Sequence, residues 1–171
     1  MSLTRCWIVS LTTNNNDLIF TIFVSMKCLI QRVLNAAVKV NNKEVAAIEK
    51  GLLVFLGVGN EDDLKMMETM VKKITQLRIF NDEQGKMNHS VMDVNGEILL
   101  VSQFTLYADC KKGNRPSYIQ AAAPAFAETI FASMAEEFEK ILKRPVGKGI
   151  FGADMKVSLV NDGPVTIWLE M

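Results

Sequence analysis

The sequence predicts a single domain of the α+β class. Short apolar runs rich in β-branched residues recur along the chain and are typical of strands. Two longer segments repeat apolar residues every three or four positions, which is typical of amphipathic helices. Strands and helices do not alternate as they do in a βαβ fold, which favours a mixed sheet covered by two helices. A chain of 171 residues suits one domain.

The regular pattern begins at Met26, and we expect residues 26–171 to form the domain. The first 25 residues differ from the rest, with two apolar runs around the polar stretch Thr12–Asp17. Neither run approaches the roughly 18 apolar residues of a membrane-spanning helix. We expect this extension to be disordered, or to result from a start codon assigned too early, with Met26 as the functional start.

Strands are expected first. Met26–Val33 forms one, and Ala37–Val40 and Glu44–Ile48 flank a hairpin turn at Asn41-Asn42-Lys43. Gly51–Val58 is almost continuously apolar and predicts a buried strand.

Two helices are expected. The acidic pair Asp62-Asp63 favours a helix start, and Pro124 suits the first turn of a second helix that ends before Pro145 and Gly147. The predicted buried faces are Leu64, Met67, Val71, Ile74 and Leu77 or Arg78 in the first helix, and Phe126, Ile130, Met134, Phe138 and Ile141 in the second.

Between the helices, Asn95-Gly96 predicts a hairpin turn and Glu97–Phe104 a buried strand. Near the C-terminus, the runs Val157–Val160 and Val165–Leu169 flank Asn161–Thr166. Its Gly-Pro pair weakens a strand, because proline cannot donate to the ladder. The stretch is either a turn between hairpin strands or a fixed main-chain feature that another molecule approaches closely.

Composition excludes several classes of function. The 19 basic and 19 acidic residues balance, which argues against a general nucleic-acid coat. Three scattered cysteines give no disulfide or zinc pattern, and a reducing cytoplasm is expected. The one histidine, His89, falls in a polar loop, so we expect neither a metal nor a cofactor.

Candidate chemistry gathers at the end of the predicted strand, in Ser102-Gln103-Phe104-Thr105. Loops held by rigid strands often carry sites, although Ser102 and Thr105 could equally be ordinary strand-end hydrogen bonders. Neither hydroxyl has a nearby base to activate it. Hydrolysis here would therefore depend on positioning and on backbone N–H donors that stabilise an oxyanion.

Val101–Tyr107, taken together with Asn161–Thr166, resembles the paired motifs of the D-aminoacyl-tRNA deacylases, the D-tyrosyl-tRNA deacylase family. The resemblance covers residues 26–171 and none of residues 1–25. It continues through Ile30-Gln31-Arg32-Val33, Gly51–Val58, Leu77–Phe80, Gly85–Asn88, Lys112–Ser117 and Phe151–Val157.

The resemblance implies a compact, barrel-like homodimer with active sites at the subunit interface. It implies hydrolysis of the ester that joins a D-amino acid, or glycine, to the terminal adenosine of tRNA. Gly163 and Pro164, cis in the family, would present carbonyls to the substrate's amino group and crowd out an L side chain. Arg32 would support that loop through its fixed fork of donors.

Thr105 matches the position once proposed as the family's nucleophile. Because no base is in sight, we favour attack by water assisted by the RNA 2′-OH, with the N–H groups near Phe104 and Thr105 as oxyanion donors. Phe151 and Met155 match positions near the terminal adenine, although Phe151 taken alone would more often be core. Lys111, Lys112 and Arg115 would either touch acceptor-stem phosphates or form a solvated loop.

Two other classes of function stay open on the sequence. One is a non-catalytic nucleic-acid-binding module on the same fold, against which the zero net charge counts. The other is a structural or small-ligand-binding homodimer, which would have no need for both motifs.

Overall fold

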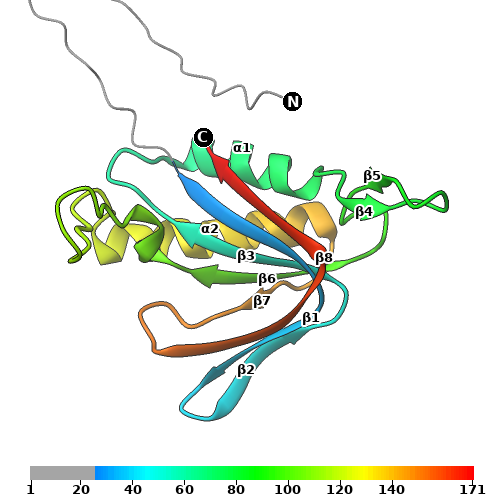
Figure 1. Ribbon diagram of the computed structural model, residues 1–171, viewed down its shortest axis with the longest axis horizontal. Helices are drawn as coiled ribbons and strands as arrows, with labels where there is room; N and C mark the ends of the chain where they lie inside the picture. The colour runs from blue at the N-terminus through cyan, green and yellow to red at the C-terminus, as the bar shows by residue number, and fades with distance from the viewer. Residues whose placement is uncertain (1–25) are drawn as a thin grey trace, which may run out of the picture.

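The computed structural model describes residues 26–171, in which a curved sheet carries two helices on one side (Figure 1). The α+β prediction is confirmed; the expectations for residues 1–25 lie outside the described residues. The elements are β1 (Lys27–Val40), β2 (Lys43–Ile48), β3 (Gly51–Gly57), α1 (Leu64–Thr75), β4 (Phe80–Asn81), β5 (Met87–His89), β6 (Glu97–Ser102), the 3₁₀ helix η1 (Phe104–Tyr107), α2 (Pro124–Leu142), β7 (Gly147–Lys148) and β8 (Met155–Glu170).

The main sheet is mixed and nearly closed into a barrel. Its strands follow the order β2-β1-β3-β6-β7, and β8 pairs with the remaining edge of β1. The β3–β6 and β6–β7 pairs are parallel, while β1 pairs antiparallel with β2, β3 and β8. The short strands β4 and β5 form a separate antiparallel pair.

Strand β1 is continuous, so the prediction of separate strands at Met26–Val33 and Ala37–Val40 is wrong. Its first half pairs with β3 and its second half with β2, so this one strand passes from one part of the sheet to another. Leu34 and Asn35 are exposed at the changeover. Their exposure interrupts the apolar pattern without ending the strand.

Strand β8 is also continuous, so of the two alternatives for Asn161–Thr166 the hairpin turn is wrong (Figure 1). In the β1–β8 ladder Gln31 pairs with Thr166 and Val33 with Asn161. Only Arg32 therefore stands opposite residues 162–165, which bulge out of the ladder. The Gly163–Pro164 peptide bond inside this bulge is cis.

The turn at Asn95-Gly96 joins no hairpin, because the strand that follows it runs parallel to β3. Gly96 N–H donates to Val91 O at 2.8 Å, which closes a local turn before β6. The strand then ends at Ser102, earlier than the predicted Phe104. The chain turns at once into η1.

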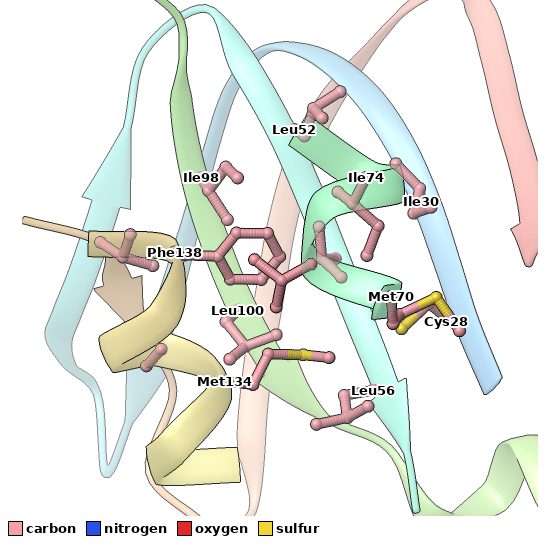
Figure 2. Close-up of a cluster of buried hydrophobic side chains, with 14 of the residues drawn as sticks. Cys28, Ile30, Leu52, Leu56, Met70, Ile74, Ile98, Leu100, Met134 and Phe138 are labelled. Atoms are coloured by element: carbon pink, nitrogen blue, oxygen red, sulfur yellow. The ribbon is translucent and has the colours of Figure 1, made fainter. Parts of the chain in front are cut away.

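Both helices cover the same face of the sheet. Asp63 caps α1 by accepting from Met66 N–H at 2.7 Å, and Pro124 begins α2 as predicted. The predicted faces are partly wrong, because Leu64 is 52% exposed and Phe126 is 40% exposed. Figure 2 shows the core between the layers, formed by Cys28, Ile30, Leu52, Leu56, Met70, Ile74, Ile98, Leu100, Met134 and Phe138. Within residues 26–171 no helix is long and apolar enough to cross a membrane.

Candidate active site

A pocket of about 580 Å³ opens where β6 runs into η1. It brings Ser102, Gln103 and Phe104 together with Phe151 and Met155, which come from a segment some fifty residues further along the chain. The remaining lining is mostly apolar and comes from Leu56, Val58, Val101, Tyr118, Ala121, Ala122, Pro124, Ala127, Phe131, Gly152, Ala153, Asp154 and Val157.

The turn from β6 into η1 is held by main-chain contacts. Gln103 N–H donates to Leu56 O at 2.7 Å, and Gln103 O accepts from Leu106 N–H at 3.2 Å. The first N–H groups of a helix, here those of Phe104 and Thr105, have no partner within that helix. Phe104 is 58% exposed, so this turn meets solvent at the pocket mouth.

Thr105 is not among the residues that line the pocket. Its hydroxyl accepts a hydrogen bond from the Gln103 side-chain amide. An amide cannot take up a proton, so this contact orients the hydroxyl without activating it. His89 lies in β5, in the separate small sheet. Among residues 26–171 no group of three or more His, Cys, Asp or Glu could hold a metal ion.

Phe151 and Met155 form an apolar surface on another side of the pocket. The Phe151 ring lies 6.1 Å from that of Phe131, centroid to centroid, at 53°. A Cβ atom at Gly149 would lie 2.6 Å from Met155 Sδ, so glycine there leaves room for the thioether. Both side chains are half-buried and keep one side open to the pocket.

Two other lining residues, Tyr118 and Asp154, were missed by the sequence reasoning. The Tyr118 ring packs edge-on against Phe104 at 5.0 Å. The exposed Asp154 carboxylate pairs with Lys156 at 3.0 Å. Tyr118 lies outside the segments that carry the family resemblance and Asp154 lies within Phe151–Val157, but only the fold shows that both line the pocket.

The second motif is held by Arg32, which is 5% exposed. Its Nε donates to Asp162 O at 3.2 Å and lies 3.0 Å from Asp162 Oδ2. The other end of the guanidinium donates to Ile79 O. Arg32 therefore ties the bulge in β8 to the segment before β4.

Gly163 and Pro164 are exposed and are not among the residues lining the pocket of their own chain. Gly163 has φ +122°, a conformation that favours glycine. Within the described chain, the structure joins Ser102, Gln103 and Phe104 with Phe151 and Met155, while Arg32, Gly163 and Pro164 form a separate cluster.

The basic residues lie in an exposed loop that precedes the pocket residue Tyr118 in the chain. Asp109 and Ser117 pair as an isolated bridge at its base, and Lys111 N–H donates to Asp109 Oδ1 at 2.8 Å. Lys112 and Arg115 are exposed at its tip. Their charges are open to an anionic partner.

Behind the pocket lies a buried carboxylate, Asp62, which is 5% exposed. Burial raises its pKa to about 6, although hydrogen bonds from Gly59 and Tyr107 lower it in part. Burial also raises the pKa of Tyr107 and of the Cys28 thiol, and the Asp62 charge adds to both shifts.

We expect Asp62→Asn to change how stability depends on pH. The pKa of Asp62 rises from 3.8 to about 6 on folding, so the folded state binds the proton more tightly. Asp62 therefore stabilises the fold most below pH 4, and this stabilisation is lost as the pH rises through 6. The free energy of unfolding lost in this way is on the order of 3 kcal/mol. Urea unfolding from pH 4 to 7 should show the variant gaining stability relative to wild type as the pH rises. A constant difference across this range would contradict the assignment.

The family model and two relatives that match this chain are described as tRNA deacylases. The family model described as D-Tyr-tRNA(Tyr) deacylase matches residues 29–170. Two relatives are named D-aminoacyl-tRNA deacylase. One, from Thermosipho africanus (strain TCF52B), is 53% identical over 148 residues; the other, from Christiangramia forsetii (strain DSM 17595 / CGMCC 1.15422 / KT0803), is 50% identical over 145. Each match covers 85% of this chain and 97% of the relative.

Two solved structures share the fold. One is titled c-Myc DNA Unwinding Element Binding Protein, with a TM-score of 0.81, 45% identity, and coverage of 85% of this chain and 98% of that chain. The other, a probable eukaryotic D-amino acid tRNA deacylase, has a TM-score of 0.74 at 16% identity, covers 86% and 100%, and shows the fold alone. Given the family match and the two relatives, the chain belongs to the D-Tyr-tRNA(Tyr) deacylase family, whose members are hydrolases acting on aminoacyl-tRNA esters.

Proposed function

We propose that this protein hydrolyses the ester bond of D-aminoacyl-tRNA and of glycyl-tRNA, and so removes wrongly charged amino acids before translation in the cytoplasm. The observation that carries the proposal is the pocket of this family member, which joins Ser102, Gln103 and Phe104 with Phe151 and Met155. Polar groups on one side and an apolar surface on the other suit a polar ester attached to a flat base.

In the proposed reaction, water attacks the ester carbonyl with help from the ribose 2′-OH of the RNA. The carbonyl oxygen becomes an oxyanion that accepts hydrogen bonds from the N–H groups of Phe104 and Thr105, with Ser102 or Gln103 near by. The bond between carbonyl carbon and ribose oxygen then breaks, and the ribose oxygen takes the proton that water released. The protein supplies orientation and donors, which can suffice for an already reactive ester.

Phe151 and Met155 would hold the terminal adenine. An aromatic ring and a thioether both pack well on the flat face of a base. The exposed Lys111, Lys112 and Arg115 would contact acceptor-stem phosphates next to the same pocket. A basic loop beside an apolar base site suits a substrate in which a chain of charged phosphates leads to an uncharged terminal base.

The chiral filter would come from a second copy of the chain in a homodimer. Gly163 and Pro164 are exposed, lie outside their own chain's pocket and are held by the buried Arg32. Presented to a partner's pocket, their carbonyls would bind the α-amino group and leave no room for an L side chain. A main-chain filter reads the α-carbon alone, so it accepts many D residues and cannot reject glycine by a clash.

The direct test is a deacylation assay with D-tyrosyl-, L-tyrosyl- and glycyl-tRNA side by side. We expect hydrolysis of the D-tyrosyl and glycyl esters, and at least roughly 100-fold slower hydrolysis of the L-tyrosyl ester. Equal rates for the D and L esters would refute the chiral filter, and no hydrolysis of either would refute the enzyme.

We expect Thr105→Ala to retain substantial activity. The change removes one hydrogen bond with Gln103, which corresponds to a loss in kcat of less than roughly tenfold. Loss of a true nucleophile would instead cost on the order of 10⁴-fold or more. The control is Thr69→Ala, whose hydroxyl donates to Lys65 O on the exposed face of α1. Single-turnover deacylation of D-tyrosyl-tRNA separates the two outcomes.

A second candidate function is DNA binding, favoured by the 45% identical structure whose title names a DNA unwinding element. We propose it as the alternative in which the fold binds nucleic acid without turnover. Tight, salt-sensitive binding to duplex DNA with no release of D-tyrosine from D-tyrosyl-tRNA would favour it. The balance of 19 basic and 19 acidic residues counts against it.

A further inference from the structure

Asp62 is a buried carboxylate that takes no part in the proposed reaction, and its burial destabilises the charged form. It is a carboxylate buried to 5% exposure, yet it does not line the pocket. Nor does α1 need it, since the neighbouring Asp63 caps that helix. Among residues 26–171 its Oδ1 is buried without a hydrogen-bond partner, so the bonds that Asp62 makes offset only part of the loss of water. Its partners therefore indicate what it does.

The first partner is the turn after β3. Asp62 Oδ2 accepts from Gly59 N–H at 2.8 Å. Gly59 in turn pairs with Ala121 as an isolated bridge, and Ala122 N–H donates to Val58 O at 2.9 Å. Val58, Ala121 and Ala122 all line the pocket, so Asp62 fixes the turn on which one pocket wall rests.

Asn60 strengthens the same attachment. Its side-chain Nδ2 donates to Ile119 O at 3.1 Å, and its main-chain N–H donates to Gln120 O at 3.3 Å. The segment 119–122, which we call the pocket wall, is thus bonded residue by residue to the turn that Asp62 holds. Tyr118, just before it, carries the ring that packs on Phe104.

The second partner is Tyr107, the last residue of η1. A hydrogen bond joins its side chain to Asp62, and Tyr107 itself is 2% exposed. A Cβ atom at Gly57 would lie 3.1 Å from Tyr107 Cε2 and from Leu106 Cβ, so η1 packs closely on β3. Fixing Tyr107 fixes the far end of η1, the helix that begins at the pocket residue Phe104.

We propose that Asp62 is a positioning residue that fastens the pocket wall and η1 to each other from behind. It touches neither substrate nor reacting atoms. Through Gly59 it fixes the position of the pocket wall, against which the substrate would pack. Through Tyr107 it fixes the position of η1 and its N–H donors. The kinetic part of this proposal rests on the deacylase function proposed above.

The two parts of the fold that Asp62 supports, the pocket wall and η1, can be loosened separately. Asn60→Asp keeps the size of the side chain and removes the donor to Ile119 O, so we expect KM for D-tyrosyl-tRNA to rise roughly fivefold with kcat little changed. Tyr107→Phe keeps the packing and removes the hydroxyl, so we expect kcat to fall roughly fivefold with KM little changed. Asp62→Ala should produce both effects, while Asp62→Asn, which keeps an acceptor for Gly59 N–H, should restore most of the activity.

A double-mutant cycle tests the connection itself. If Tyr107 acts on kcat through Asp62, then adding Tyr107→Phe to Asp62→Ala should cost no further kcat. The matched control is Asp93→Ala, which removes a carboxylate that holds another turn through Ser90 N–H and Ser90 Oγ, both at 2.7 Å, away from the pocket. It should lower stability and leave both kinetic constants within twofold.

Amide exchange keeps this proposal separate from the function on which its kinetics rest. Asp62→Ala should speed exchange at Ala121 and Ala122, whereas Asp93→Ala should not. If wild type fails to hydrolyse D-tyrosyl-tRNA, the proposed function fails while exchange still reports on the wall. Unchanged exchange in Asp62→Ala would overturn the proposal. So would Asn60→Asp and Tyr107→Phe both keeping kcat and KM within twofold of wild type.

Discussion

Replacing Gly163 with alanine is expected to lower kcat/KM for D-tyrosyl-tRNA by roughly 100-fold, the cost of misplacing a positioning group by about 1 Å. The new Cβ would lie 2.8 Å from Val165 Cγ2 and 3.0 Å from Arg32 Nη2. Both neighbours sit in the bulge of β8 or hold it, so relieving the contact moves the bulge. The φ of +122° adds a backbone cost that alanine cannot avoid.

Gly85→Ala provides the matched control for this change. Gly85 also has a positive φ, of +77°, but a Cβ there meets nothing within 4 Å. The control therefore also carries a positive-φ penalty, about 1–2 kcal/mol, without displacing a neighbour. We expect it to retain the activity and D-over-L selectivity of wild type. Gly163→Ala retaining them as well would show that the bulge does not act on substrate.

Local patterns predicted both helices and the buried strands, but not where β1 and β8 continue or which segments meet at the pocket. Met67, Val71 and Ile74 are buried where helical spacing placed them, because a helix face depends only on nearby residues. The pocket lining could not be predicted in this way, since Tyr118 and Ala121 come together with Phe151 only after the sheet has folded. No spacing in the sequence links these segments.

The local sequence left Asn161–Thr166 open between a turn and a fixed main-chain feature, and this ambiguity has a physical reason. Glycine and proline usually indicate a turn, and nothing within the stretch reveals that its strand continues. The continuation depends on Arg32, far away in the sequence, which fills the gap left in the ladder and bonds to Asp162. A buried guanidinium with several carbonyl partners can hold a bulge that would otherwise end the strand.

For the acidic pair before α1, the sequence predicted the role of Asp63 at the helix start but not the role of Asp62. Two adjacent acids at a helix start suggest one shared electrostatic role. In the fold they point to different tasks, because Asp63 caps α1 and Asp62 turns inward to Gly59 and Tyr107. Adjacent residues diverge in this way at a helix start, where the chain leaves extended geometry.

The largest effect on stability is expected from Gly51→Ala, at the start of β3. A Cβ there would lie 2.0 Å from Glu97 O and 2.7 Å from Glu97 C and N, inside the parallel β3–β6 ladder. Because all three atoms belong to the main chain, no rotamer change relieves the contact, and the two strands must separate. We expect a loss of more than about 4 kcal/mol, among the most severe single changes.

Urea unfolding monitored by circular dichroism measures this loss. The control is Gly113→Ala, in which the Cβ meets nothing within 4 Å and the φ of +87° costs only about 1–2 kcal/mol. We expect Glu97→Gly not to rescue Gly51→Ala, since the conflict is with the backbone of residue 97. A Gly51→Ala protein with the wild-type midpoint would show that β6 can shift relative to β3. In that case Ser102, at the end of β6, would not be held in place by this ladder, and the pocket would need another support.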